Sequence, residues 1–598
     1  MKRSKIKNQS SNPSSKLKSF NFKLSFEFCT LRFDFIQLLF ILLFFILVLP
    51  INATEIPNNK YGIHLAQPYP EAIKETADLV NSNGGKWGYV TVVIQENDRD
   101  KNKWQGIFNQ MRELNLIPII RLATSAEGEN WRRPEKQDIK GWIDFLDSLN
   151  WVVKNRYIVL FNEPNHGSEW GGEVDPKSYI QVVFEFAKSL KEKNPDFFVM
   201  ISGFDASAPS WMPGLEDEET FLRGILNFNP PAGGSIFNYI DGWASHSYPN
   251  PGFTGSPYAS GRGTVRTYEW ELELLKELGV NKELPVFITE TGWKHNQNQI
   301  SKIKYQNLST QLVADYFQIA FEEVWNKDDR VWAVTPFVLD YQSDPFLEFS
   351  WKALNSSDFY QQYYTVQSLT KTKGDPVQID KGKIKFSLPK ELVIQSKYNF
   401  KIILSNQGQA VWDKDNDYQL IVSTNTGNKS NYLFEDLKDI KPFEEKDVYL
   451  TFKTDENLSE KTAKLILEKD GKNILESADW KFSILPLPSL QFETKFFPWG
   501  KGKGNDYEIQ IFDVDDRLVF KKKNLSVKQG IGELKSVQNI TLDDLYRIVL
   551  LKPYHLPRQE FVVFKKNNNV VKFKSLLPFD FNNDGTFNFK DILYLIKK

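Results

Sequence analysis

The stretch Tyr-Ile-Val-Leu-Phe-Asn-Glu-Pro, residues 157–164, shows the pattern on which the fold prediction rests. Its apolar side chains follow one another without interruption, and Asn162, Glu163 and Pro164 then end the run. A continuous apolar run of this length is typical of a strand buried on both faces, as strands are in a parallel sheet. We therefore expect polar side chains at the carboxyl end of a buried parallel strand.

Similar runs alternate with longer amphipathic stretches between Tyr61 and Leu369. The expected strands are Tyr61–Leu65, Trp87–Gln95, Ile117–Thr124, Tyr157–Asn162, Phe197–Gly203, Ile240–His246, Pro285–Glu290 and Val331–Leu339. The expected helices include Glu71–Asn81, Trp104–Leu114, Lys140–Val153, Ser178–Lys193, Tyr268–Leu278 and Leu308–Trp325. This alternation predicts an α/β fold, a (β/α)8 TIM barrel over residues 56–372. An open doubly wound sheet is the alternative, but the first unit lacks both glycine-rich phosphate-binding motifs.

The pattern changes after about Asp375, where apolar and polar residues alternate with a period of two. Short runs of this kind, separated by turn residues, predict antiparallel strands. We expect an immunoglobulin-like β-sandwich over residues 373–486, with Trp412 in its core, and a second β-rich module over residues 487–577. Both modules could serve as spacers or as carbohydrate-binding modules.

Residues 1–55 are expected to lie outside the fold, as a signal peptide or an N-terminal membrane anchor. A basic segment without acidic residues precedes an apolar run from Phe35 to Leu49. This run is shorter than the roughly 20 residues that a membrane-spanning helix needs, which favours a cleaved secretory signal over an uncleaved anchor. Either reading predicts a protein that is extracellular or held at the cell surface.

The composition excludes several other classes of protein. Lys and Arg number 75 and Asp and Glu 76, so the basic excess expected of a nucleic-acid-binding protein is absent. Cys29 is the single cysteine, which rules out intramolecular disulfides and a cysteine-rich zinc site. The 16 Trp fit either large cores or rings that stack on sugars, and composition does not decide between them.

Two carboxylates stand at strand ends, where the chemistry of a (β/α)8 barrel takes place. Glu163 ends the fourth expected strand and Glu290 ends the seventh. Strands four and seven lie on opposite sides of an eight-stranded ring, so the two carboxylates can face each other across the mouth. A pair of this kind is the equipment of glycoside hydrolysis, in which one group protonates the leaving oxygen and the other attacks the anomeric carbon.

Other polar residues stand at neighbouring strand ends. Arg121 ends the third strand and could hold a carboxylate ionised, and Tyr248, after the sixth strand, could orient Glu290. His246 ends the sixth strand and His64 the first, and both are candidate substrate-binding residues. The alternatives are a structural ion pair for Arg121 and satisfied core histidines for the other two.

Together, Asn162-Glu163-Pro164, Glu290, Arg121 and the His-x-Tyr after strand six resemble the clan A glycoside hydrolases, which include families five and thirty-nine. The resemblance covers about half the chain. It implies Glu163 as acid/base, Glu290 as nucleophile and Asn162 as a ligand of the sugar 2-hydroxyl, with retention of configuration at a β-linked substrate. Many clan members carry a Trp at the end of strand eight. Here Phe337, Trp332 or Trp293 would have to provide the sugar-binding surface.

Residues 580–591 match the pattern of a calcium-binding loop. The expected metal ligands are Asp580, Asn582, Asp584, Thr586 and Asp591, and a solvated acidic turn is the alternative. The expected C-terminal segment, residues 578–598, contains this loop and the apolar residues that follow it, and it resembles one half of a dockerin module. A dockerin carries two such repeats, so docking to a cohesin is not expected from one.

The sequence thus predicts a secreted or surface-anchored retaining β-glycoside hydrolase that acts on poly- or oligosaccharides and needs no cofactor for catalysis. A transglycosylase would use the same residues. A non-catalytic carbohydrate-binding or adhesion protein on a barrel scaffold is a further alternative, although such a protein has no need of two opposed carboxylates.

Overall fold

The computed structural model describes residues 58–597, except for 229–233, 296–307 and 425–431. The predicted signal peptide or anchor, residues 1–55, lies outside the described residues. Within the described part of the chain, no helix is both long and apolar enough to span a membrane.

Eight parallel strands form one sheet in the order β1-β2-β3-β6-β7-β8-β9-β10. They are β1 (Gly62–Leu65), β2 (Gly88–Gln95), β3 (Leu116–Ala123), β6 (Arg156–Leu160), β7 (Phe197–Ile201), β8 (Gly242–His246), β9 (Val286–Glu290) and β10 (Val331–Val334). The first and last strands also meet, because the Val334 amide donates to the Lys60 carbonyl at 2.9 Å and the Leu339 amide donates to the His64 carbonyl at 3.0 Å. The sheet is therefore the predicted barrel-like ring, and each strand begins within two residues of its expected start, although the eighth ends at Val334 rather than at Leu339.

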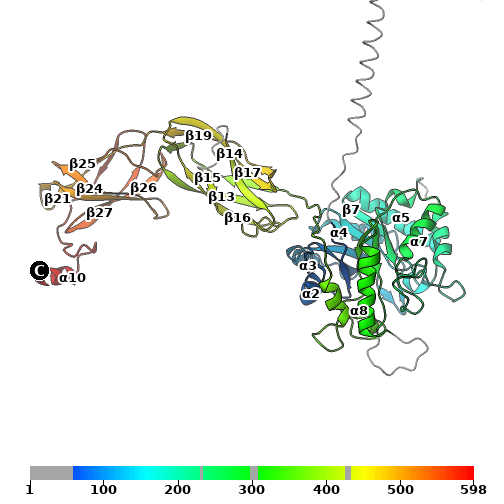
Figure 1. Cartoon of the computed structure of the whole chain (residues 1–598). Helices are drawn as coiled ribbons and strands as arrows, with labels where there is room; N and C mark the ends of the chain where they lie inside the picture. The colour runs from blue at the N-terminus through cyan, green and yellow to red at the C-terminus, as the bar shows by residue number, and fades with distance from the viewer. Residues whose placement is uncertain (1–57, 229–233, 296–307, 425–431, 598) are drawn as a thin grey trace, which may run out of the picture. The chain divides into compact units, whose positions relative to one another are not determined.

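Helices lie outside this ring of strands (Figure 1). They are α2 (Pro70–Val80), α3 (Lys101–Glu113), α4 (Asp138–Asp147), α5 (Pro176–Lys193), α6 (Glu218–Leu226), α7 (Thr267–Glu277), α8 (Thr310–Ile319) and α9 (Gln361–Ser368). Side-chain caps fix several starting points: Asp175 accepts from the Ser178 amide, and Asp217 accepts from the Thr220 amide. Each cap sets where a loop of the barrel mouth gives way to a helix.

Aromatic rings fill part of the barrel interior. The rings of Tyr89, Tyr157 and Phe287 come from three different strands, and their centroids lie 5.3–6.1 Å apart. Rings at these separations and tilts pack as aromatic pairs do in protein cores. The interior is therefore a packed core, and a substrate could be held only at one end of the barrel.

A pair of buried carboxyl groups lies under the helical layer. Glu218 on α6 and Glu271 on α7 are both fully buried; burial raises the pKa of both, and the neighbouring Glu271 charge raises the pKa of Glu218 further. Glu271 accepts a hydrogen bond from the Trp243 indole at 3.0 Å. Neither oxygen of Glu218 has a donor among the described residues, so the pair can be accommodated only if it retains a proton.

Replacing Glu271 with glutamine should flatten the dependence of stability on pH. The unfolded chain releases both protons above about pH 4.3, whereas the folded pair retains one, so folding is favoured at low pH and loses stability as the pH rises. The glutamine amide can donate to Glu218 without this proton. We expect the fall in the unfolding midpoint between pH 5 and pH 8 to be about 2 °C smaller in Glu271→Gln. The exposed Glu277 on the same helix provides the control, Glu277→Gln, and an unchanged slope in Glu271→Gln would contradict the shared proton.

Two β-rich segments follow the barrel. The first contains a sheet of β11 (Gly382–Phe386), β13 (Lys397–Asn406), β16 (Glu445–Lys453) and β15 (Tyr432–Phe434), and a sheet of β12 (Glu391–Val393), β19 (Trp480–Leu485), β17 (Ser459–Lys469), β14 (Tyr418–Thr424) and β18 (Lys472–Glu476). Side chains of both sheets share one core that includes Trp412, as predicted.

The second β-rich segment is built on one seven-stranded sheet with its own core. Its strands are β27 (His555–Val563), β26 (Leu545–Lys552), β23 (Gly504–Phe512), β24 (Leu518–Lys528), β25 (Ile531–Leu534), β20 (Leu490–Glu493) and β28 (Asn569–Lys572). A hairpin of β21 (Lys495–Phe496) and β22 (Gly500–Lys501) accompanies it, and α10 (Phe589–Lys597) follows the acidic loop.

Candidate active site

Glu163 and Glu290 meet at the carboxyl ends of their strands, with His246 between them. Glu290 is the last residue of β9, His246 is the last residue of β8, and Glu163 lies three residues beyond the end of β6. His246 Nδ1 lies 2.7 Å from Glu163 Oε1 and 3.9 Å from Glu290 Oε2. One oxygen of each carboxylate and the ring nitrogen all lie within 4.8 Å of one another. The structure therefore brings together the two carboxylates that the sequence places on strands four and seven.

The backbone that carries Glu163 is strained. Phe161 has φ +72° and Glu163 has φ +23°, in or near the left-handed region that bulky residues rarely adopt. Such a conformation costs about 1–3 kcal/mol and persists only where the surroundings impose it. The Phe161 ring packs edge-on against Trp170 and Phe186, which holds the turn in place. Strain at a strand end that carries a carboxylate is the kind of backbone feature that clusters at active sites.

Glu290 is held as an anion. Burial by itself would raise its pKa, but the positive charges of His246 and Arg121 outweigh this effect, and the pKa of Glu290 is lowered. The Tyr248 hydroxyl donates to Glu290 Oε2 at 3.1 Å. Burial and the neighbouring Glu290 charge raise the pKa of Tyr248 well above its ordinary value, so the phenol keeps its proton and remains a donor. An ionised, oriented carboxylate of this kind can act as a nucleophile.

His246 is the positive partner of both carboxylates. Burial lowers the pKa of an imidazole, but here the charges of Glu290 and Glu163 outweigh it and raise the pKa of His246. The ring also needs space that only glycine leaves. A Cβ atom at Gly203, just after β7, would come within 2.2 Å of the His246 ring. Gly203 thus permits the imidazole to lie between the carboxylates.

Several buried polar atoms at the mouth have no protein partner. Both ring nitrogens of His64, Nε of Arg121 and Oδ1 of Asn162 make no hydrogen bond within the part of the chain that the structure describes. His64 Nε2 lies 3.9 Å from Glu290 Oε1. Burial lowers the pKa of His64 to about 3, so the imidazole is neutral there. Buried polar groups are rarely left without partners, so this cluster points to a polar ligand.

A third carboxyl group, Glu169, belongs to the site but was not predicted. It lies in the short 3-10 turn after β6, near Glu163 and Glu290. Burial raises its pKa to about 7, with Arg121 and Asn162 acting in the opposite direction. Glu169 follows no strand directly, so the rule that catalytic residues stand at strand ends could not single it out.

The three aromatic residues proposed as sugar-binding surfaces are placed differently from one another. Trp293 is 1% exposed, donates its indole to the Gly255 carbonyl and packs on Phe317, which leaves no face for a sugar. Trp332 lies at the amino end of β10, the end away from the carboxylates. Phe337 lies with its ring centroid 5.1 Å from that of His64, next to the polar cluster. Of the three, Phe337 alone is positioned to contact a ligand held by Glu290.

Glu163, His246 and Glu290 could also bind a divalent metal ion, since their ligand atoms lie close enough together. However, the charge of Arg121 already stabilises Glu290 and would oppose a cation at the same point. The charges around Glu290 therefore favour an ionised carboxylate and the binding of a neutral ligand.

Two of the predicted metal ligands after residue 579, Asp580 and Asp591, lie near each other. Asp580 and Asp591 are buried, and the Asp591 carboxylate accepts from the Asn582 and Asn588 amides. Asp580 Oδ2 accepts from the Gly585 amide, whereas its buried Oδ1 has no partner in the described residues. Burial and the nearby Asp591 charge raise the pKa of Asp580. An unpaired, buried carboxylate oxygen beside a second carboxylate is what a bound Ca²⁺ would satisfy.

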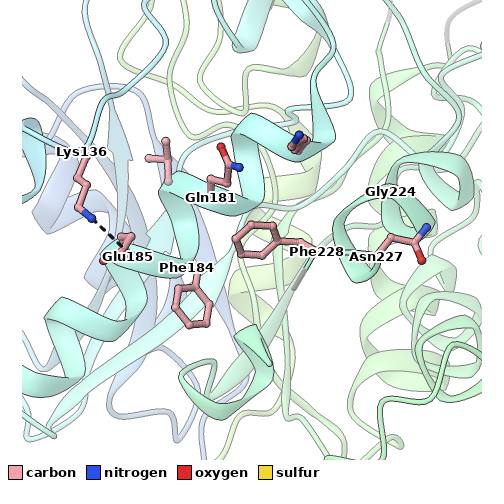
Figure 2. Close-up of a pocket in the computed structure, with 9 residues that line it drawn as sticks. Lys136, Gln181, Phe184, Glu185, Gly224, Asn227 and Phe228 are labelled. Carbon is pink, nitrogen blue, oxygen red and sulfur yellow. Dashed lines mark ion pairs between the residues drawn. The ribbon is translucent and has the colours of Figure 1, made fainter. Parts of the chain in front are cut away.

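A hollow of about 660 Å³ lies elsewhere, on the outer face of the barrel between α5 and α6. Figure 2 shows its lining, in which Phe184 and Phe228 face one another and Lys136 pairs with Glu185 at 3.6 Å. Glu185 is the single carboxylate in this lining, and it is already paired. The lining of this hollow therefore lacks the pair of carboxylates that glycoside hydrolysis needs, and the hollow is not an alternative active site.

Comparison with known proteins leaves the family open. No protein-family model matches the chain, and no curated protein matches it.

Solved structures with a related arrangement include glycoside hydrolases. An FMN-binding beta-glucuronidase from Facaelibacterium prausnitzii is 10% identical with a TM-score of 0.33, and the match covers 72% of this chain and 56% of that protein. An endo-beta-1,4-glucanase from Xanthomonas axonopodis pv. citri is 12% identical with a TM-score of 0.35, and the match covers 52% of this chain and 98% of that one. A Bacteroides uniformis beta-glucuronidase is 9% identical with a TM-score of 0.36 over 83% of this chain and 66% of that one. Because every one of these TM-scores is below 0.5, these likenesses do not indicate a function for this chain.

Proposed function

We propose that the protein is a glycoside hydrolase that cleaves β-linked poly- or oligosaccharides with retention of configuration. The observation that carries the proposal is the approach of one carboxylate oxygen of Glu163 to one of Glu290, to within 4.8 Å across the barrel mouth. Carboxyl groups about 5–5.5 Å apart serve retaining enzymes, whereas inverting enzymes need about 6.5–9.5 Å to admit a water molecule. The polar atoms of His64, Arg121 and Asn162 that have no hydrogen-bond partner among the described residues provide ligands for sugar hydroxyls.

The two carboxylates would divide the chemistry between them. Glu290, held ionised and oriented by Tyr248, attacks the anomeric carbon and forms a covalent glycosyl-enzyme, while the bond to the leaving oxygen breaks. Glu163 gives that oxygen its proton and then removes a proton from the water that releases the sugar. His246 Nδ1 is hydrogen-bonded to Glu163 Oε1 and so holds the Glu163 carboxyl group in place during both proton transfers.

Secretion, or attachment to the cell surface, belongs to the same proposal, because residues 1–55 read as an export signal or an anchor and polysaccharides lie outside the cell. A transglycosylase would share the glycosyl-enzyme and differ only in the acceptor. A purely carbohydrate-binding protein would bind sugars without turnover.

The test is a screen of aryl β-glycosides and soluble polysaccharides with the full chain, in the presence of EDTA to exclude a metal-dependent activity. Proton NMR of the first product distinguishes the mechanisms, because retention gives the β-anomer before mutarotation. A first product of α-configuration, or hydrolysis lost in EDTA while the unfolding midpoint is unchanged, would contradict the mechanism. Sugar binding without any turnover would favour the non-catalytic alternative, and transfer to an added alcohol would favour the transglycosylase.

A structural calcium ion at residues 580–591 is a second part of the proposal. Asp580, Asn582, Asp584, Thr586 and Asp591 would hold it. The ion would tie the start of α10 to the loop, since Asp591 lies in the first turn of that helix.

Asp580→Asn should abolish most of the calcium affinity. Loops of this class bind Ca²⁺ with dissociation constants of about 10⁻⁷ to 10⁻³ M, and loss of a buried carboxylate should weaken binding by at least about tenfold. Isothermal titration calorimetry of the full chain with CaCl₂ provides the measurement. Asp515→Asn, in an exposed turn of the second β-rich segment, is the matched control. Equal calcium binding by both variants would favour the solvated acidic turn.

A further inference from the structure

One tryptophan in a loop at the barrel mouth, Trp211, has a solvent-exposed side chain. Trp211 lies in the loop between β7 and α6 and is 82% exposed, whereas most of the described Trp side chains are buried. A ring of this size removes a large apolar area from water when it packs, and the exposed Trp211 ring forgoes that stabilisation. A single exposed apolar side chain is ordinary in itself, so the position of this ring beside the site decides what it can contact.

The loop that carries Trp211 is braced at several points. Within it, the Met212 amide donates to the Pro209 carbonyl, and the Leu215 amide donates to the Met212 carbonyl. Arg262, from the loop after β8, donates to the Ala206 carbonyl at 2.6 Å and pairs with Asp217 at 2.5 Å. The ring is therefore exposed on a fixed backbone, and it could bind a ligand without first being ordered.

The same loop is hydrogen-bonded to the segment that directly follows Glu163. The Gly167 amide donates to the Gly214 carbonyl at 2.8 Å, and the Glu216 amide donates to the Asn165 carbonyl at 2.9 Å. In addition, His166 Nε2 lies 2.9 Å from Asp205 Oδ2, at the start of the loop. Trp211 is thus attached to the side of the mouth that carries Glu163, and Glu290 enters from the opposite strand.

We propose that Trp211 is a sugar-stacking platform on the leaving-group side of the site, and that the enzyme acts on glycan chains that continue beyond the cleaved bond. This inference rests on the proposed function, in which Glu163 protonates the leaving oxygen. The leaving sugar must then lie on the Glu163 side of the mouth. The flat C–H face of a β-linked pyranose matches the face of an indole, and its hydroxyl groups remain in water.

Native affinity electrophoresis tests the platform separately from catalysis. The full chain carrying Glu290→Gln, which prevents digestion of the gel, is run with carboxymethyl cellulose, mixed-linkage β-glucan, galactomannan or arabinoxylan. We expect at least one polysaccharide to retard this parent protein, and adding Trp211→Ala to weaken retardation about tenfold, while Trp211→Tyr restores part of it. Trp499→Ala is the matched control, because Trp499 is 93% exposed but lies in the second β-rich segment.

Kinetics give the second readout. In the otherwise unchanged enzyme, Trp211→Ala should lower kcat/KM about tenfold on oligosaccharides of the retarding polysaccharide, and less than about twofold on a β-glycosyl fluoride, whose single-atom leaving group is too small to stack on the indole. The inference is overturned by absence of retardation in all four gels, by full retardation of the Trp211→Ala protein, by loss of retardation in Trp499→Ala alone, or by equal losses on both substrates. Failure of the proposed function looks different: no glycoside is hydrolysed, while the gels still report on Trp211.

Discussion

Glu290→Ala is expected to reduce hydrolysis of an aryl β-glycoside by at least about 10⁴-fold, because the covalent intermediate can no longer form. The structure supports this magnitude. The charges of His246 and Arg121 keep Glu290 ionised, and the Tyr248 hydroxyl orients it. Both effects serve a group that reacts as an anion. The measurement is the rate of release of the phenol at saturating substrate.

Azide provides the decisive control for Glu290→Ala. The truncated side chain leaves room for a small anion at the anomeric carbon, so azide should restore turnover and give the α-glycosyl azide. Glu283→Ala, just before the other end of the same strand, removes an exposed carboxylate from the same segment and should leave the rate unchanged. A β-configured azide, or a Glu290→Ala rate equal to wild type, would assign the nucleophile elsewhere.

The barrel could be predicted from the sequence because parallel strands that are buried on both faces leave uninterrupted apolar runs. The β3 and β6 strands are clear examples. Two helices of the outer layer, α6 and α9, were not predicted, because with nine and eight residues they offer few periodic positions. Strand eight was drawn too long, to Leu339, because its apolar residues continue after the strand ends at Val334.

The candidate site could be predicted only in part. Strand ends placed Glu163 and Glu290 at the mouth, but the link that His246 makes between them depends on the strained turn at Phe161 and on the space at Gly203. Trp293 was misjudged as a sugar-binding surface. Gly292 before it has φ +145°, and the indole that follows packs on Phe317 in the helical layer.

Loop residues were the harder case. Glu169 and Trp211 lie outside the periodic segments, and the exposure of a loop side chain depends on contacts with distant loops rather than on its neighbours in the sequence. The bracing by Arg262, which reaches the Trp211 loop from another βα unit, is such a contact. Nothing in the local sequence around Trp211 predicts it.

Glu163→Ala should produce a loss of activity that depends on the leaving group. A general acid contributes about 10²- to 10⁴-fold, and its contribution shrinks as the leaving group becomes able to depart without a proton. We therefore expect a loss of about 10³-fold on an oligosaccharide and a far smaller loss in the first step with a dinitrophenyl β-glycoside. Rapid-mixing measurements of phenol release separate this first step from release of the sugar.

The second step of the reaction gives Glu163→Ala its own signature. Without the base, the glycosyl-enzyme on Glu290 accumulates, and azide should relieve the block by attacking that intermediate to give the β-glycosyl azide. Glu173→Ala provides the matched control, since Glu173 is exposed in the same loop and pairs with Arg133. Glu290→Ala should give the α-glycosyl azide and Glu163→Ala the β-glycosyl azide, so the configurations of the two azide products together assign both roles. If Glu163→Ala slows all substrates equally, or yields the α-azide, Glu163 is not the acid/base, and its hydrogen bond to His246 serves only to position the imidazole beside Glu290.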